Sequence, residues 1–126
     1  MSLVLDAGAL LAVERGDRDT IALLKQELVA GRTPVTHGGV IGQVWRGGAR
    51  RQANLSRLLP ALTIVAIDDA MGRRAGVLLG RARRSDVIDA AIILLASDGD
   101  MILTSDVRDL RPLASAAGSD VDLVPV

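Results

Sequence analysis

Apolar residues along the chain follow two alternating patterns, one typical of short strands and one typical of helices. Runs such as "SLVL" at 2–5 and "MILT" at 101–104 are apolar at nearly every position, which indicates buried strands. Elsewhere apolar residues recur every three or four positions, as at Ile21, Leu24 and Leu28, which predicts amphipathic helices. The expected strands are 2–5, 33–37, 63–67, 101–104 and 121–126. The expected helices are 8–14, 17–31, 40–46, 51–62, 68–82, 86–97 and 109–118.

Strands that alternate with helices in this way favour a parallel sheet with helices on both faces. We therefore expect an α/β fold, a three-layer α/β/α sandwich around a central parallel sheet of about five short strands. The chain has 126 residues, of which 49% are hydrophobic, and a mean hydropathy of +0.34. That length suits one domain with a substantial core. No repeat or linker divides it, so the prediction is a single domain over 1–126.

The composition limits both the expected cellular location and the kinds of metal site that are possible. No apolar run approaches the roughly 18 residues of a membrane span, and the N-terminus lacks the basic region of a signal peptide. We therefore expect a cytoplasmic protein that does not contact membranes. There is no cysteine and only one histidine, His37, which excludes disulfides, thiolate zinc sites and sites built from several imidazoles. A metal would need oxygen ligands, which favours Mg²⁺ or Mn²⁺.

The net charge is zero, but the two signs are distributed differently along the chain. Arginine, which grips phosphate with two hydrogen bonds, is concentrated between residues 46 and 84, and the aspartates lie mostly before and after that region. One interpretation is a solvated arginine-rich surface. The other is a basic rim around an acidic pocket, as in an enzyme that acts on nucleic acid. Phe and Tyr are absent and Trp45 is the only aromatic residue, so no stacking platform for single strands is expected.

The stretch "SDVIDAAIILLASDGDMILTSDVRDL" at 85–110 places six aspartates among strongly apolar residues. Ligands of an open parallel sheet bind beyond the carboxyl ends of its strands. Asp6 follows the first expected strand and Asp106 follows strand 101–104, so the two carboxylates face one crevice if these strands are neighbours. Asp86 and Asp89 share one helix face and belong to the same edge, because their helix precedes strand 101–104.

Each acid also has a purely structural interpretation. Asp86 is a candidate N-cap with Asp89 at the third helical position, and Asp6 is a candidate cap of the helix that follows it. Asp106 and Asp109 are candidates for turn and cap residues, and Asp98 and Asp100 look like the end of a helix, with no further role. When the acids are considered together, the structural interpretation is weaker. Carboxylates about 4 Å apart repel by roughly 4 kcal/mol at an effective dielectric constant near 20, so a cluster is unfavourable unless a divalent cation neutralises it.

Other chemistries find little support in the sequence. There is no glycine-rich phosphate loop and no nucleophile elbow for a serine hydrolase. A phospho-receiver-like regulator, with Asp6 or Asp106 as phosphoacceptor, would need a lysine on its last strand. The only lysine, Lys25, lies in an expected helix.

Three segments, "VLDAGALLA", "SDVIDA" and "ILTSDVRDL", resemble the PIN-domain nucleases, and more narrowly the VapC-type toxins of bacterial toxin–antitoxin pairs. The resemblance extends over essentially the whole chain and its order of elements. It implies a PIN-like fold and an endoribonuclease that depends on Mg²⁺ or Mn²⁺ and cuts RNA phosphodiesters with an activated water. It also implies a cognate VapB-like antitoxin that pushes a basic side chain into the acidic pocket, and a homodimer.

The resemblance also implies roles for individual residues. Asp6, Asp89 and Asp106 match the family's catalytic, metal-binding acids. Asp86 and Asp109 match nearby acids that act through water. The family's hydroxyl beside the site corresponds to Ser105, and less closely to Thr104.

One position departs from the family pattern. Gln43 stands where most members carry a metal-site glutamate, which removes one negative charge, and Glu14 is the only acid available to replace it. Arg46, Arg50 and Arg51 are candidates for RNA contacts in the basic-rim interpretation, although Arg46 could equally serve helix packing. The alternative function is a catalytically weakened PIN module that binds RNA or protein without cleavage.

Overall fold

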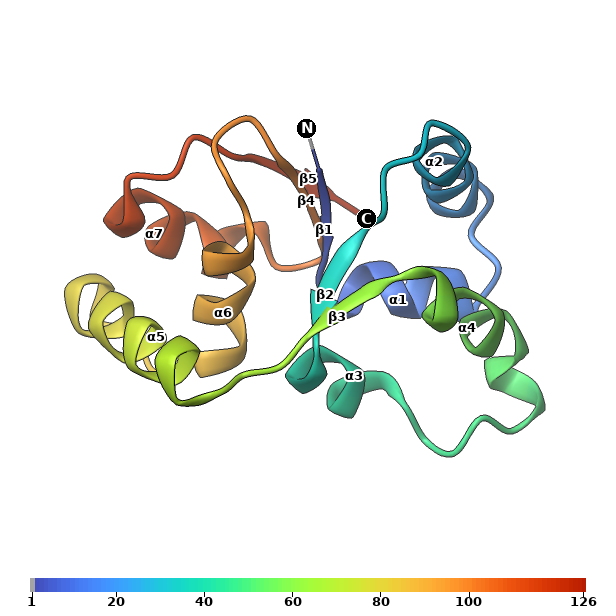
Figure 1. The fold of residues 1–126 in the computed structure, drawn as a ribbon, viewed down its shortest axis with the longest axis horizontal. Helices are drawn as coiled ribbons and strands as arrows, with labels where there is room; N and C mark the ends of the chain where they lie inside the picture. Colours follow the sequence, from blue (N-terminus) through green and yellow to red (C-terminus); the bar gives the residue numbers. More distant parts are fainter. Residues whose placement is uncertain (1) are drawn as a thin grey trace.

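The computed structural model describes residues 2–126, which form one sheet enclosed by helices (Figure 1). All strand pairs are parallel, in the order β3-β2-β1-β4-β5. The strands are β1 (Leu3–Leu5), β2 (Val35–His37), β3 (Thr63–Val65), β4 (Met101–Thr104) and β5 (Asp122–Pro125). The helices are α1 (Ala7–Glu14), α2 (Arg18–Val29), α3 (Gly38–Val44), α4 (Ala53–Leu58), α5 (Asp69–Ala82), α6 (Val87–Leu95) and α7 (Val107–Ala117). The predicted fold class is confirmed.

Two groups of helices cover the two faces of the sheet. Helices α5, α6 and α7 pack together on one side, and α1, α2 and α4 lie on the other (Figure 1). The central strands β1 and β4 are neighbours, with Leu5 opposite Leu103. This is the adjacency that brings the carboxylates expected after these strands to one edge.

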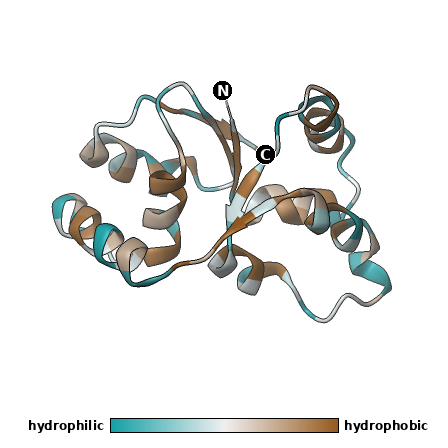
Figure 2. Ribbon diagram, viewed as in Figure 1, coloured by the Kyte–Doolittle hydropathy of each residue, from teal (hydrophilic) through white to brown (hydrophobic). Residues whose placement is uncertain are grey.

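The core is built where the central strands meet α1 and α6. Leu3, Val4 and Leu5 are buried, as are Ile102 and Leu103, because strands of a parallel sheet are covered on both faces. Leu10 of α1 and Ile92 and Ile93 of α6 are buried in the same cluster. The apolar residues accordingly concentrate on the strands and on the inward faces of the helices (Figure 2).

The predicted helices differ from the observed ones by one or two residues at their ends, except 51–62, which differs more. The predicted helix 51–62 is wrong as a continuous element, because it is divided into a 3₁₀ turn (Arg50–Gln52), α4 and a second 3₁₀ turn (Leu59–Ala61). Pro60 lies in the second turn and has no N–H to continue an α-helix. Helix α3 begins two residues earlier than predicted, at Gly38, because the His37 side chain caps it.

Among the described residues, no helix combines the length and apolar character needed to cross a membrane.

The end of α5 adopts an unusual backbone conformation. Arg83 has φ 54° and ψ 49°, in the left-handed region, and it is the only non-glycine residue of the described chain with a positive φ. The N–H of Arg84 donates to Leu79 O at 3.0 Å, which is the hydrogen bond of a Schellman-type helix end. Glycine is the preferred residue at this position, because a Cβ makes the left-handed conformation unfavourable by about 1–2 kcal/mol.

Replacing Arg83 by glycine should therefore stabilise the fold. We expect Arg83→Gly to raise the free energy of unfolding by about 0.5–1 kcal/mol, after allowance for the greater freedom of glycine in the unfolded chain. Urea denaturation measures the effect. The matched control is Arg81→Gly within α5, which should destabilise by about 1 kcal/mol. A loss of stability in Arg83→Gly would show that the Arg83 side chain makes a stabilising contact.

Candidate functional site

Asp6 is the most rigidly held acid at the carboxyl edge of the sheet. It follows β1 directly and is 2% exposed. Its Oδ1 accepts the N–H of Ala7 at 2.8 Å, which caps α1, and its backbone N–H donates to Leu103 O of β4 at 3.0 Å. The cap interpretation is thus confirmed for Asp6, but Oδ2 is left for another partner.

That partner is Thr104, whose hydroxyl links the two strand ends. Thr104 is fully buried, and its Oγ1 donates to Asp6 Oδ2 at 2.7 Å. The same oxygen accepts the backbone N–H of Asp106 at 2.9 Å. Thr104 therefore fixes the Asp6 carboxylate and the position of Asp106 together.

The family resemblance favours Ser105 as the hydroxyl beside the site, whereas in the structure the Thr104 hydroxyl is the one that hydrogen-bonds Asp6. Ser105 is exposed and lies against the first turn of α1. A Cβ at Gly8 would come within 2.5 Å of Ser105 Oγ and 2.8 Å of its backbone nitrogen, so only glycine permits this approach. Gly8 thus allows the loop that carries Asp106 to pass close to Asp6.

Asp86 and Asp89 lie at the start of α6, as predicted. Asp86 is the N-cap, with Oδ1 accepting the N–H groups of Ile88 at 2.9 Å and Asp89 at 3.2 Å. Its cap interpretation is confirmed. Asp89 is half-buried in the first turn and makes no contribution to the cap through its side chain.

The electrostatics of Asp89 show that the acids converge. Burial, as the largest single effect, and four neighbouring carboxylates together raise the pKa of the Asp89 carboxyl to about 7. These neighbours, in decreasing order of effect, are Asp86, Asp6, Asp106 and Asp109. Acids from three separate parts of the chain therefore act on one carboxyl group.

Three of these acids line a cleft of about 160 Å³ between α6 and α7, and Asp6 and Asp106 are not among the residues that line it. Asp86 and Asp89 line it from α6, Asp109 and Leu113 line it from α7, and Arg84 and Ser85 close it from the turn that follows α5. Asp106 is exposed at the start of α7, where its side chain makes no cap hydrogen bond.

His37 has a structural role that sequence reasoning missed. Its buried ring caps α3, with Nδ1 accepting the N–H groups of Gly39 at 3.1 Å and Val40 at 3.3 Å. Nε2 lies 3.0 Å from Ile88 O and must donate there, because a carbonyl oxygen only accepts. Burial lowers the pKa of His37, against smaller opposing effects of the Ile88 carbonyl and Asp6. A neutral imidazole thus joins the end of β2 to the first turn of α6.

Other candidate residues lie apart from this cleft. Gln43 is exposed in the last turn of α3 and is not among the residues that line the cleft. Glu14 accepts a hydrogen bond from Gln52 Nε2 at 2.7 Å, so it joins α1 to the chain before α4 and does not replace the missing glutamate. The structure therefore does not support Glu14 as the replacement for the acid that is missing at Gln43.

The three arginines expected to contact RNA do not line the cleft either. The guanidinium of Arg46 folds back on its own helix, where Nη1 donates to Gly42 O at 3.1 Å and to Trp45 O at 2.7 Å. This is the packing role weighed for Arg46. Arg50 and Arg51 are exposed in the 3₁₀ turn before α4.

Asp98 and Asp100 hold turns, as expected. Asp98 Oδ1 accepts the N–H of Asp120, and the Asp100 carboxylate accepts the N–H groups of Ser2 and Ser97. Both lie near the start of β4, away from the acid cleft.

The donor set has the chemistry of a hard-metal site, because it consists of carboxylate oxygens that repel one another without a cation. Across residues 2–126, however, no three Asp, Glu, His or Cys side chains are arranged as a ready metal-binding group. Asp86, Asp106 and Asp109 are exposed, and exposed side chains reorient readily.

Known proteins were compared with the chain by sequence and by structure. Neither a family model nor a curated relative matches it by sequence. By structure, 16 chains match. One of them belongs to the crystal structure of VapBC2 from Rickettsia felis bound to a DNA fragment from its promoter, with a TM-score of 0.69 at 14% identity over 99% of this chain and 98% of that one.

Removing the Thr104 hydroxyl should destabilise the protein. Thr104→Val leaves Asp6 Oδ2 and the Asp106 N–H without their buried partner, at an expected loss of about 1–3 kcal/mol in the free energy of unfolding. Thr104→Ser keeps the hydroxyl and is the matched control. Urea denaturation of both variants checks this, and equal stabilities would contradict the bridging role.

Asp89 should make stability depend on pH in a definite direction. Its pKa is about 7 in the folded state, against 3.8 for an ordinary aspartate side chain. Between these values the folded state binds the extra proton, so this group's contribution to the free energy of unfolding falls as pH rises and levels off above about 7. His37 has the opposite sign, because burial lowers its pKa.

The comparison of wild type with Asp89→Asn isolates the Asp89 contribution. In metal-free buffer, the variant should gain stability over wild type as pH rises from about 4 to 7. Thermal unfolding across this range measures the difference. A difference that does not change with pH would mean that Asp89 is already ionised in the folded protein at low pH.

At 14% identity the structural likeness concerns the fold. In this chain five parallel strands, the helices that enclose them and the acids at the carboxyl edge form the α/β fold class that the sequence predicted. The chain therefore shares the fold of a chain in a VapBC complex, and its five-stranded parallel sheet enclosed by helices has the PIN-like architecture that the sequence predicted.

Proposed function

We propose that the protein is a metal-dependent endoribonuclease toxin of the VapC type, which cleaves RNA phosphodiesters with an activated water. The observation that carries the proposal is the half-buried Asp89 carboxyl, whose pKa is raised to about 7 by burial and by four other aspartates. Perturbed carboxyl groups of this kind gather at functional sites. The PIN-like fold supports the same reaction class.

Mg²⁺ or Mn²⁺ is the cofactor that this donor set suits, with Asp6, Asp89 and Asp106 as direct ligands. Asp86 and Asp109 would act through water. Such an ion lowers the pKa of a bound water and stabilises the negative charge that develops on the phosphate.

The chain's own residues divide the remaining tasks. Asp6 is held in one orientation by Ala7 N–H and the Thr104 hydroxyl, so it provides a fixed reference point for the site. Asp89, protonated over part of the neutral range, must lose its proton before it can serve as a ligand. Because the nucleophile is water and not a ribose 2′-hydroxyl, the products carry a 5′-phosphate and a 3′-hydroxyl.

A VapB-like antitoxin is the proposed partner. The Rickettsia felis protein of similar fold is part of a VapBC complex bound to its promoter DNA. We extend to this chain the antitoxin partner, and also the homodimer that the family resemblance implies. An antitoxin that neutralises the acid cleft with a basic side chain would lower the repulsion around Asp89.

Gln43 supports the alternative of a module that binds RNA or protein without cleavage. It places a neutral amide where most of the family carries an acid, so the expected donor set has one negative charge fewer. The cleavage experiment separates the two functions.

The test is to map RNA 5′ ends in cells that express the chain without an antitoxin. We expect new 5′-phosphate ends at one or a few sites, and a reduction of at least about a hundredfold in Asp6→Asn, because a ligand acid is lost. Circular dichroism of the purified variant controls for folding. If wild type and Asp6→Asn give the same ends while both are folded and abundant, the enzyme is excluded and the binding module remains.

A further inference from the structure

The acid cleft contains one basic residue, Arg84, that is not engaged with the acids around it. Arg84 lines the cleft together with Asp86, Asp89 and Asp109. Among the ion pairs and side-chain hydrogen bonds of residues 2–126, none joins the Arg84 guanidinium to these carboxylates. Arg84 is exposed, so its guanidinium is available to another anion.

The backbone that presents Arg84 is held in an unfavourable conformation. Arg83 occupies the left-handed region at φ 54°, where glycine would be preferred, and the N–H of Arg84 is bonded to Leu79 O. This turn directs the chain from α5 back to α6, and so places residue 84 beside the acids. A local departure from the favoured residue next to a candidate site indicates a role other than stability.

The chemistry of the cleft indicates which anion Arg84 would receive. A guanidinium matches a phosphate geometrically, with two parallel hydrogen bonds. In an RNA strand that presents one phosphate to the acids, the next phosphate lies one nucleotide away, within reach of a residue that lines a cleft beside those acids.

We propose that Arg84 binds the RNA phosphate next to the scissile one and so sets the register of the strand in the cleft. This inference rests on the proposed ribonuclease function. It assigns the phosphate contact to the α5–α6 turn, and not to Arg46, Arg50 or Arg51, which lie outside the cleft.

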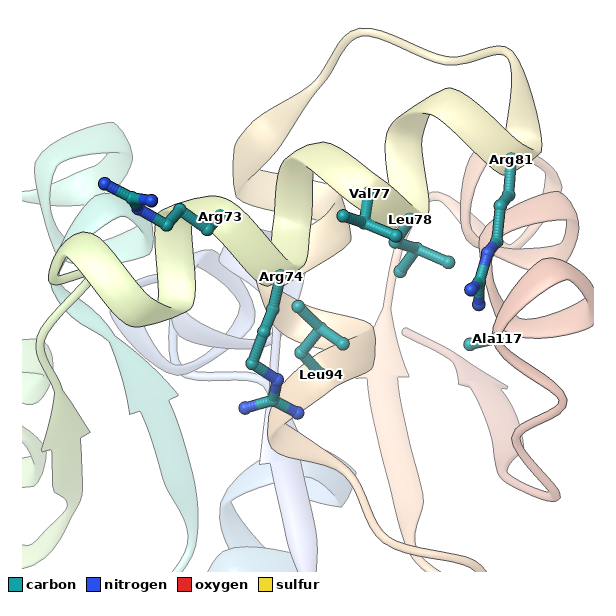
Figure 3. A pocket seen from close by; sticks show the side chains of 7 residues that line it. All are labelled: Arg73, Arg74, Val77, Leu78, Arg81, Leu94 and Ala117. Atoms are coloured by element: carbon teal, nitrogen blue, oxygen red, sulfur yellow. The ribbon is translucent and has the colours of Figure 1, made fainter.

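Other arginines of α5 provide an internal comparison. Arg73, Arg74 and Arg81 line a separate groove with Val77, Leu78 and Leu94 (Figure 3). In that view Arg81 extends from α5 toward Ala117 of α7. Arg81 carries the same charge three positions from Arg84 but does not line the acid cleft, so Arg81→Gln is the matched control for Arg84→Gln.

The first experiment measures binding without cleavage. In the Asp6→Asn background, fluorescence anisotropy follows binding of a fluorescein-labelled single-stranded RNA of mixed sequence over a series of salt concentrations. Arg84→Gln should weaken binding roughly tenfold at low salt and reduce the slope of log K against log salt by about 0.7, the value for one phosphate contact on a single strand. Arg84→Lys should keep the slope, and Arg81→Gln should keep both slope and affinity.

The second experiment measures cleavage of the RNA site found by 5′-end mapping. Arg84→Gln should raise KM about tenfold and leave kcat nearly unchanged, because a neighbouring phosphate is bound equally in the ground and transition states. Arg84→Lys should recover part of the loss.

The possible failures are distinguishable. If wild type cleaves RNA but Arg84→Gln keeps its KM and its salt slope, the role of Arg84 is overturned and the ribonuclease stands. If wild type neither cleaves nor binds RNA, the proposed function fails and the inference fails with it. If Arg84→Gln and Arg81→Gln weaken binding equally, the effect is general surface charge, which also overturns a specific contact.

Discussion

The parallel pairing of β1 with β4 is the constraint on which the rest of the site depends. It places Asp6 and Thr104, which are 98 residues apart in the chain, within a 2.7 Å hydrogen bond. The Thr104 hydroxyl then also receives the N–H of Asp106, so the ends of the two strands behave as one unit. Loss of a fully buried hydroxyl that both donates and accepts a hydrogen bond strongly destabilises a fold. These strand ends are therefore the rigid part of an otherwise exposed edge.

Around these strand ends, repulsion between neighbouring carboxylates destabilises the folded state. Asp89 lies half-buried in the field of four other aspartates, and its carboxyl is protonated up to about pH 7 as a result. A fold selected for stability alone has no need of this arrangement, because asparagine or serine would cap and turn the chain as well. The repulsion has a use if a cation, or a basic side chain of a partner, enters the cleft and relieves it.

The acids at the carboxyl edge and the residues around them differ in burial. Asp6 and the neutral His37 ring are buried and hydrogen-bonded to elements on either side of them, whereas Asp86, Asp106, Asp109 and Arg84 are exposed. One buried acid with a fixed orientation, together with several exposed acids that can reorient, suits a site that must admit both an ion and a polynucleotide. The strained end of α5 places a further exposed residue, the basic Arg84, beside these acids.

The sequence by itself determined the fold class, the order of elements and the edge at which the acids lie, because apolar periodicity and position after a strand are local properties of the chain. It also identified the caps at Asp6 and Asp86. Tertiary structure alone decided that Thr104 and not Ser105 contacts Asp6, that Glu14 is taken by Gln52, and that His37 locks β2 to α6. These are contacts between residues far apart in the chain, and they depend on strand order and helix packing, which no local pattern of residues encodes.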